Sequence, residues 1–206
     1  MQVLVRSKIS NADLDAIHQL DTSFSATSVY QVAVREDGFR LRETPVPPLS
    51  RRYDLTEGVT AGSRPWDLYA LAVTDTRPVG FMATTYERWN GRQVVNELHV
   101  APTHRRRGLA RELLGLVAVT ARENGARELW LETQNVNIAA VRAYRRLGFV
   151  LTGIDTTRYL PPYDDEVALF MSAPVPPPFA DPAAVPPPSA DPAAVPPFAD
   201  PAGDGG

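Results

Sequence analysis

The sequence predicts an α+β domain, with a mixed, mostly antiparallel central sheet flanked by helices, followed by a disordered proline-rich tail. Three observations predict this class. The hydrophobic patterns run from several alternating strands into helix, strand, helix, strand and strand. The composition is that of a globular protein, with 44% hydrophobic and 22% charged residues among 206. A repeat rich in Pro, Ala and Asp forms the end of the chain. We therefore expect one domain at 1–173 and the tail at 174–206.

The first part of the domain is expected to contain a strand, a helix and a hairpin. The run "VLVR" is typical of a short strand, and Asn11 stands where an N-cap would open the helix "ADLDAIHQL". Residues 29–43 form two alternating runs around Asp37-Gly38, which is a hairpin pattern.

Three further strands are predicted after a loop. Prolines, glycines and charges dominate from Val46 to Pro65, so this stretch is expected to be the loop. The strands at 66–73, 78–89 and 92–100 are separated by short turns, one of them Asn90-Gly91. They predict an antiparallel meander.

The second half alternates helices with strands. A helix is expected from about Gly108 to Asn124, with Gly125 as its stop. Its predicted apolar stripe consists of Leu109, Leu113, Leu116, Val117 and Thr120. The remaining elements are a buried strand at 127–133, a helix capped by Asn137 that runs to Leu147 and ends at Gly148, and strands at 149–153 and 166–171.

Composition excludes several classes of function. The chain has no cysteine, which removes disulfides, thiolate metal sites and cysteine nucleophiles. Three scattered histidines do not predict a metal site. The net charge of -3 does not fit a globally basic nucleic-acid binder. No secretory signal or membrane span is recognisable, so we expect a cytoplasmic protein without membrane partners.

The repeat at the end, with "PPPFADPAAV" followed by "PPPSADPAAV", predicts a semi-stiff extended chain. A ligand for a proline-binding module is the alternative. No basic residue accompanies these prolines, which favours the simple tail.

The junction between the strand ending at Val100 and the following helix predicts an anion site. Arg105, Arg106, Arg107 and Gly108 stand directly before the helix. The first turn of a helix offers unpaired N–H groups and the positive end of its dipole, and glycine allows a ligand to approach the backbone closely. The motif is neither a Walker loop nor a dinucleotide fingerprint. A solvated basic corner is the alternative interpretation of these residues alone.

Two motifs give the chain a family resemblance. The pattern R-x-x-G-x-A after an antiparallel strand resembles the pyrophosphate signature of the GNAT acetyltransferases. The same family carries a second motif one strand later, and this chain has Asn137, Ala140, Tyr144 and Gly148-Phe149 at the matching spacing. From about Leu68 to Phe149 the chain resembles a GNAT domain. The resemblance implies the GNAT fold, acetyl-CoA as co-substrate and no metal.

A closer resemblance is to the streptothricin (nourseothricin) acetyltransferases. It rests on "LWLETQNVNIAAVRAYRRLGF", "GIDTTRY", "EVALFMS", "VREDGFRLRETPVPPL" and "ERWN", which together span most of residues 30–172. This resemblance implies acetyl transfer to a primary amine of a cationic small molecule, the β-lysine amine of streptothricin, and hence antibiotic resistance. Another amine substrate, a non-catalytic coenzyme A-binding module, and assembly as a homodimer stay open.

The resemblance also implies the residues of the site. The expected coenzyme A-binding residues are Leu98, His99, Val100, Arg105, Arg106, Arg107, Gly108, Leu109, Ala110, Arg111, Asn137, Ala140 and Tyr144. A backbone N–H near Leu98 to Val100 would stabilise the oxyanion. Tyr144 would protonate the leaving thiolate, and a core aromatic residue is the alternative role.

Acetyl transfer to an amine also requires a base. An alkylammonium titrates near ~10.4, so only about one in a thousand is neutral at physiological pH. Glu97 is the candidate base, and His99 alternates onto the same strand face and could share the task. Alternatively Glu97 faces solvent or pairs with Arg92. Five other acids are available to a cationic substrate, although each alone is expected to be solvated: Glu87, Glu132, Asp155, Asp164 and Asp165.

Overall fold

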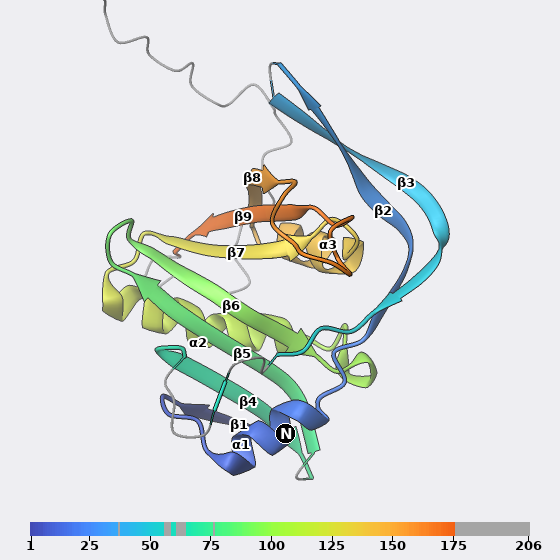
Figure 1. The fold of residues 1–206 in the computed structure, drawn as a ribbon. Helices are drawn as coiled ribbons and strands as arrows, with labels where there is room; N and C mark the ends of the chain where they lie inside the picture. Colours follow the sequence, from blue (N-terminus) through green and yellow to red (C-terminus); the bar gives the residue numbers. More distant parts are fainter. Residues whose placement is uncertain (37, 56–58, 61–64, 76, 176–206) are drawn as a thin grey trace, which may run out of the picture.

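A computed structural model describes residues 1–175 apart from 37, 56–58, 61–64 and 76. The strands are β1 (Gln2–Arg6), β2 (Phe24–Arg35), β3 (Gly38–Arg51), β4 (Leu68–Thr74), β5 (Arg77–Glu87), β6 (Arg92–Val100), β7 (Glu128–Gln134), β8 (Val150–Asp155) and β9 (Ala168–Pro174). The helices are α1 (Asn11–Gln19), the 3-10 turn η1 (Pro102–His104), α2 (Leu109–Asn124) and α3 (Ile138–Arg146). Figure 1 shows a central sheet with a long curved hairpin, β2–β3, at its side.

The central sheet confirms the predicted fold class. Its seven strands lie in the order β1-β4-β5-β6-β7-β9-β8. Only β6 and β7 pair in parallel among the neighbours described, and the other pairs are antiparallel. The meander β4–β5–β6 is therefore correct, and the parallel pair is joined through α2, as a parallel connection requires.

The helices cover opposite faces of this sheet, because side chains alternate along the strands. On β4, Ala70 and Ala72 pack into the core cluster beneath α2 and α3, whereas Tyr69 and Leu71 pack into a second cluster with α1. Both clusters consist of buried residues with partly buried hydrophobic side chains packed against them. The molecule thus has three layers, with α1 on one side and α2 and α3 on the other (Figure 1).

Two predictions for the first half were inaccurate. The N-cap of α1 is Ser10, not Asn11, because Ser10 and Asp13 form a reciprocal capping box. The predicted loop at 46–65 is partly strand, since β3 runs to Arg51 and pairs with β2 on both sides of an interruption at 46–48. Pro47 and Pro48 lie in this interruption, where no ladder hydrogen bond is required of them. Part of the rest of that loop, residues 56–58 and 61–64, lies outside the described residues. The predicted turn residue Asp37 also lies outside them.

The helices of the second half begin and end close to the predicted residues. Gly108 and Gly125 flank α2 with positive φ angles of 88° and 73°. Asn137 is the N-cap of α3. The buried stripe of α2 is displaced from the prediction, because Leu116 and Thr120 are only half-buried. Leu114, Ala118 and Ala121 are buried in addition to Leu109, Leu113 and Val117.

The last strand, β9, ends at Pro174, and the amide of Val175 donates to the carbonyl of Arg127 at 3.0 Å. The sheet contacts therefore continue slightly past the expected boundary at 173, and the predicted tail from 176 onward lies outside the described residues. No described helix has the length and apolar character to cross a membrane.

Candidate active site

The central feature of the site is the separation of β6 from β7. Their parallel pairing runs from Arg92 opposite Glu128 to Val95 opposite Leu131, and it stops there although both strands continue. The register of β6 against β5 shifts at the same point, which leaves Asn96 as an extra residue. A bulge of this kind bends its strand. The sheet is thereby opened between the second halves of β6 and β7.

A cavity of about 660 Å³ occupies this region. It is lined from β6 (94–99) and β7 (130–134), from α3, and from the segments on either side of the hairpin. Residues of α3 and residues 53–55, which follow β3, both line the cavity. Side chains from distant parts of the chain therefore meet here. Its volume lies within the usual range of small-molecule sites, ~300–1,000 Å³.

Glu97 and His99 lie together in this cavity. They stand opposite Ala83 and Phe81 on β5, so their side chains share the face covered by α1. The Nε2 atom of His99 lies 2.8 Å from Oε2 of Glu97, and both side chains keep about a quarter of their surface, 23% and 26% respectively. The predicted sharing of one face is confirmed. This pair can accept and relay a proton while remaining accessible to a ligand.

The backbone of β6 beyond the bulge offers hydrogen-bond donors to the same gap. The amide of Ala101 donates to Val79 of β5 at 2.9 Å. N–H groups alternate in direction along a strand, so those of Leu98 and Val100 point away from β5, to the side that β7 has left. The side chains of Leu98 and Val100 pack against the core under α2. These two residues can therefore contribute through their backbone.

Tyr144 reaches the cavity from α3, on the opposite face from Glu97. Burial of the phenol, together with the negative charge of Glu97, raises the pKa of Tyr144 well above its usual value of 10.0. The hydroxyl therefore stays protonated at physiological pH. Its ring packs near Phe149, with the centroids 5.8 Å apart, which fixes the direction of the side chain.

The predicted anion junction has an exposed backbone. Arg106 and Gly108 both have positive φ angles, 61° and 88°, and the N-cap of α2 makes no side-chain hydrogen bond to the first turn. Alternating left-handed residues turn successive N–H groups toward one side, which is a common anion-binding arrangement. Arg106, Arg107 and Arg111 are exposed around it, and Ala110 is half-buried. Leu109 is buried in the core, so only its backbone can contact a ligand.

Arg105 has a different environment from its neighbours. Its Nε donates to the carbonyl of Val100 at 2.9 Å, and its Nη2 donates to the carbonyl of Ser23 at 2.5 Å. Burial lowers the pKa of this guanidinium, and the negative charge of Asp21, which acts to raise that pKa, offsets only part of the effect. Arg105 thus joins the end of β6 to the chain before β2, which is a structural role that the sequence did not predict.

Asn137 and Ala140 meet at the start of α3. The side-chain oxygen of Asn137 accepts a hydrogen bond from the amide of Ala140 at 3.2 Å, and both residues line the cavity. The expected capping role of Asn137 is therefore present in a residue that also lines the cavity.

Four carboxylates line the cavity, namely Asp54, Glu87, Glu97 and Glu132. Arg158 is the arginine among the described lining residues, and its Nε lies 2.9 Å from Glu132. The cavity is consequently acidic and suits a cationic ligand. Of the other acids considered from the sequence, Asp155, Asp164 and Asp165 are not among the lining residues.

The sequence did not predict the contribution of Tyr53 and Asp54. The phenol of Tyr53 donates to Glu166 at 2.7 Å, and Nε of Arg51 donates to the same carboxylate at 2.7 Å. Glu166 is 1% exposed. Burial and the Glu166 charge strongly raise the pKa of Tyr53. The one signal in the sequence was an aromatic residue beside an acid, "RRYDL", inside the presumed loop.

The described residues contain no group of three or more His, Asp or Glu side chains arranged to hold a metal ion. The site is instead built from a carboxylate, an imidazole, a phenol and backbone amides. This set of groups suits proton transfer and stabilisation of an oxyanion.

Comparison with known proteins adds three findings. A model of the acetyltransferase (GNAT) family matches residues 28–149. Streptothricin acetyltransferase of Streptomyces lavendulae is 41% identical over 175 residues, which cover 80% of this chain and 91% of that protein. Streptothricin acetyltransferase of Escherichia coli is 27% identical over 152 residues, which cover 73% of this chain and 84% of that protein.

Two solved structures are also similar to this chain over most of its length. A crystal structure of nourseothricin acetyltransferase has a TM-score of 0.72 and 40% identity, covering 85% of this chain and 100% of that one. A crystal structure from Bacillus anthracis in complex with acetyl coenzyme A has a TM-score of 0.67 and 25% identity, covering 84% of this chain and 99% of that one.

Proposed function

The chain belongs to the GNAT acetyltransferase family, and we propose that it transfers the acetyl group of acetyl-CoA to the β-lysine amine of streptothricin-type antibiotics and so inactivates them. The observation that carries this proposal is the acidic cavity at the parting of β6 and β7, where Glu97, His99 and Tyr144 line one space. The relatives named for streptothricin and nourseothricin acetylation support the choice of amine.

The co-substrate fits the residues at the start of α2. The uncapped first turn and the left-handed backbone at Arg106 and Gly108 offer N–H groups to a diphosphate. Arg106, Arg107 and Arg111 supply positive charge around it, and Ala110 leaves space for a close approach. Arg105 contributes by holding the junction in place, since its guanidinium is bonded to Val100 and Ser23.

The second part of the carrier would lie against α3. Asn137 and Ala140 line the cavity beside Tyr144, on the face of the sheet that also carries α2. We assign the amide group of Asn137 to the pantetheine arm. Acetyl-CoA then supplies an activated thioester at the gap between β6 and β7, next to the backbone of Leu98, His99 and Val100.

Glu97 and His99 act on the amine. Glu97 accepts the proton of the incoming ammonium, directly or through a water, which makes the nitrogen nucleophilic. His99 holds the carboxylate through the 2.8 Å contact and can pass the proton on toward solvent. The acidic wall formed by Asp54, Glu87 and Glu132 attracts and orients the cationic substrate.

The remaining groups act on the carbonyl and the sulfur. As the nitrogen forms a bond to the carbonyl carbon, the N–H groups of Leu98 and Val100 stabilise the negative charge on oxygen. When the C–S bond breaks, Tyr144, which is protonated at physiological pH, donates its proton to the sulfur.

A thiol-release assay with acetyl-CoA and nourseothricin tests the proposed function. We expect release of one thiol per acetylated antibiotic, identified by a mass increase of one acetyl group, and loss of the antibiotic's growth inhibition. A panel with a polyamine, an aminoglycoside, an amino acid and a peptide serves as the comparison. Turnover on a member of that panel without turnover on nourseothricin would replace the substrate assignment. Binding of acetyl-CoA without turnover on any amine would replace the enzymatic one.

A further inference from the structure

A second, smaller cavity adjoins the active-site cavity. Its volume is about 260 Å³, which is slightly below the usual lower limit of ~300 Å³ for an independent small-molecule site. It shares Thr22, Tyr53, Asp54 and Leu55 with the larger cavity. Because four residues belong to both walls, the two spaces meet along one segment, and a ligand in one is adjacent to the other.

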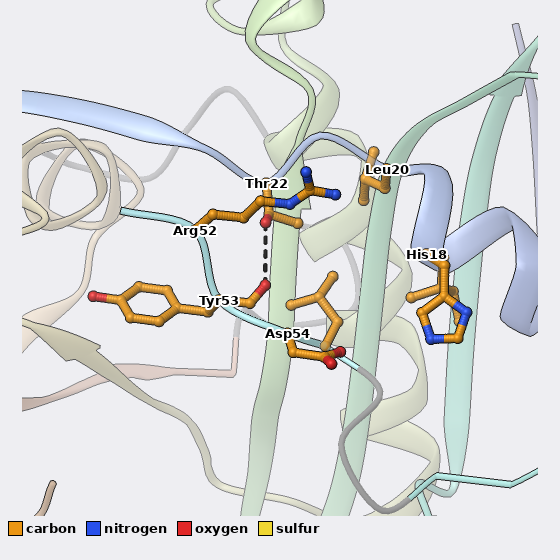
Figure 2. Close-up of a pocket in the computed structure, with 8 residues that line it drawn as sticks. His18, Leu20, Thr22, Arg52, Tyr53 and Asp54 are labelled. Carbon is orange, nitrogen blue, oxygen red and sulfur yellow. Dashed lines mark hydrogen bonds between the residues drawn. The ribbon is translucent and has the colours of Figure 1, made fainter. Parts of the chain in front are cut away.

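Residues 52–55 lie between the two cavities and direct their side chains to both. Figure 2 shows Arg52 and Asp54 extending toward the end of α1, whereas the ring of Tyr53 extends in the opposite direction. Alternation of this kind is what an extended backbone produces. Arg52 lines only the smaller cavity, and Asp54 lines both. Residues 52–55 therefore form a partition between the cavities, and the guanidinium of Arg52 is on the side of the smaller cavity only.

The partition is held firmly on both sides. The hydroxyl of Thr22 donates to the carbonyl of Tyr53 at 3.2 Å, the bond drawn in Figure 2. The phenol of Tyr53 is bonded to the buried Glu166 at 2.7 Å, and its ring packs on Tyr163 with the centroids 5.3 Å apart. The backbone of the partition at Tyr53 is thus fixed by the fold, which lowers the cost of ordering this wall around a ligand.

The lining of the smaller cavity differs from that of the larger one. Its floor is apolar, formed by Ile17, Leu20 and Leu55, which are buried. The polar side chains of His18, Arg52 and Asp54 complete the lining, and the guanidinium of Arg52 is a hydrogen-bond donor there. A charged ammonium is not favoured beside an arginine. A ring-sized group that is neutral overall and bears both hydrogen-bond donors and acceptors matches this lining.

We propose that the smaller cavity is a second acceptor subsite, which binds a polar, ring-sized part of the substrate distant from the reacting amine, with Arg52 and His18 as its specificity-determining residues. This inference rests on the proposed function, because the larger cavity must hold the amine. It explains how the chain would select a long acceptor, whose cationic end lies among the carboxylates while its other end lies against Arg52.

Steady-state kinetics with a long and a short acceptor test this subsite. Nourseothricin is the long acceptor, and β-lysine amide carries the reacting amine without the remainder. We expect Arg52→Ala to raise the KM for nourseothricin by about tenfold, as loss of a hydrogen bond to a charged group does, and His18→Ala to raise it by about threefold. The KM for acetyl-CoA and the kcat/KM for β-lysine amide should change by less than about twofold, since neither ligand reaches the smaller cavity.

Arg40→Ala is the matched control. Arg40 is an exposed arginine on β3, toward the hairpin end and outside both cavity walls. Its substitution should leave every constant unchanged. Equal KM values for nourseothricin in Arg52→Ala and Arg40→Ala would overturn the subsite, and so would a parallel loss on nourseothricin and β-lysine amide. Failure of the unmodified protein to acetylate nourseothricin is a separate result, which would overturn the proposed function itself.

Discussion

At the scale of single residues, the phenol of Tyr144 tests the proposed chemistry. We expect Tyr144→Phe to lower kcat by about 100-fold, within the usual contribution of a general acid, because the leaving sulfur no longer receives a proton. The KM for acetyl-CoA should stay within about twofold, because the ring and its packing near Phe149 are kept. Steady-state kinetics at saturating nourseothricin measure both constants.

A second tyrosine provides the control for this substitution. Tyr86 lies on β5, outside the cavity lining, and Tyr86→Phe should leave kcat unchanged. If Tyr144→Phe retained the full kcat, Tyr144 would be a packing residue, and another group or water would have to protonate the sulfur.

The sequence predicted single residues well where the relevant contact is local. Alternation along β6 placed Glu97 and His99 on one face, and the cap of α3 placed Asn137. It could not place Tyr53 or Asp54, since Tyr53 is bonded to Glu166, which lies 113 residues later in the chain. The structural contacts of Arg105 could not be predicted for the same reason, because its partner Ser23 comes from a distant segment. Local sequence patterns do not reveal contacts between residues that are distant in the sequence.

At the scale of elements, the two ends of α2 allow a matched comparison of glycines. Gly108 and Gly125 both have left-handed backbones, and an added Cβ would meet no atom within 4 Å at either position. Alanine at either site should therefore cost only the conformational penalty, about 1 kcal/mol. For a chain of this size that corresponds to a fall of about 2–4 °C in Tm.

The two substitutions should differ in their effect on the co-substrate. Gly108→Ala is expected to raise the KM for acetyl-CoA at least about fivefold, because the diphosphate must approach the backbone at this turn, whereas Gly125→Ala should leave that KM unchanged. Calorimetry with coenzyme A alone gives the same comparison without turnover. If the two variants had equal affinity for coenzyme A, the diphosphate would not bind at the turn that contains Gly108.

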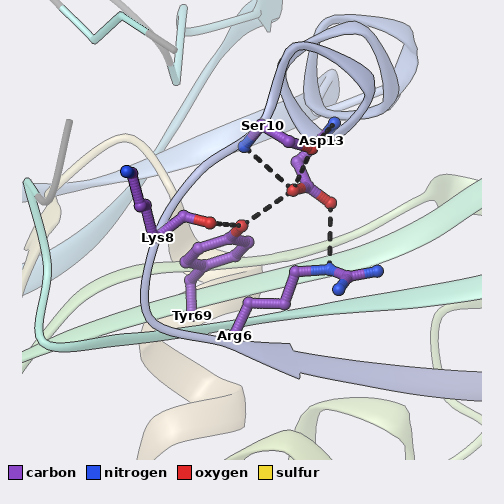
Figure 3. A network of polar contacts seen from close by, with 5 residues as sticks. All are labelled: Arg6, Lys8, Ser10, Asp13 and Tyr69. Carbon is purple, nitrogen blue, oxygen red and sulfur yellow. Dashed lines mark hydrogen bonds and ion pairs between the residues drawn. The ribbon is translucent and has the colours of Figure 1, made fainter. Parts of the chain in front are cut away.

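The start of α1 depends on a buried carboxylate. Asp13 accepts hydrogen bonds from the backbone and side chain of Ser10 and from the hydroxyl of Tyr69 at 2.9 Å, and it lies 3.3 Å from Arg6 (Figure 3). Burial alone would raise the pKa of Asp13. The hydrogen bonds from Ser10 and Tyr69 and the charge of Arg6 outweigh that effect, so the pKa is lowered below its usual 3.8.

This network predicts a pH-dependent stability. A folded-state pKa below the unfolded value stabilises the fold above about pH 4, and this contribution disappears as the pH falls through the folded-state pKa. We expect Asp13→Ala to lower the free energy of unfolding by roughly 2 kcal/mol at pH 7. Urea denaturation from pH 7 to pH 3 should show the difference from the unmodified protein narrowing in acid. Asp15→Ala, at an exposed position of the same helix, should show no such trend.

The fold class could be predicted from elements because their order alone restricts the topology. The order of meander, helix, strand, helix, strand and strand predicted a mixed sheet, and the structure shows β6 and β7 as its parallel pair. The extent of the hairpin could not be predicted, since β3 contains the prolines Pro45, Pro47 and Pro48, which argue against a strand. Pro47 and Pro48 are accommodated because they lie in an irregularity of the β2–β3 ladder at 46–48, where no cross-strand partner needs their missing N–H groups.

At the scale of the whole molecule, three kinds of contact connect the hairpin to the second half of the domain. The amide of Tyr30 donates to Asn135, whose side chain donates back to the carbonyl of Tyr30. Arg142 pairs with Glu43 at 2.7 Å on the surface. Arg51 pairs with the buried Glu166 near the active-site cavity. These contacts determine where the hairpin, and with it the partition at 52–55, lies relative to the catalytic strands.

The two ion pairs should differ greatly in their contribution. Both members of the Arg142–Glu43 pair are exposed, so solvent screens their attraction and Glu43→Gln should leave Tm unchanged. The side chain of Glu166 is 0% exposed, and Glu166→Gln leaves the guanidinium of Arg51 without its opposing charge. Breaking a buried pair costs about 3–5 kcal/mol, and the partial exposure of Arg51 favours the lower end, about 3 kcal/mol.

Thermal unfolding of the two variants measures this difference, with about 6–12 °C expected for Glu166→Gln. A second consequence follows at the active site, because Glu166 fixes Tyr53 and thereby the wall between the two cavities. At temperatures where the Glu166→Gln protein is folded, the KM for the amine should rise while the KM for acetyl-CoA stays constant, since the hydrogen bonds that hold the junction at α2, from Arg105 to Val100 and Ser23, do not include Glu166 or Tyr53. A rise in both constants would mean that the pair stabilises the domain as a whole and does not position the acceptor.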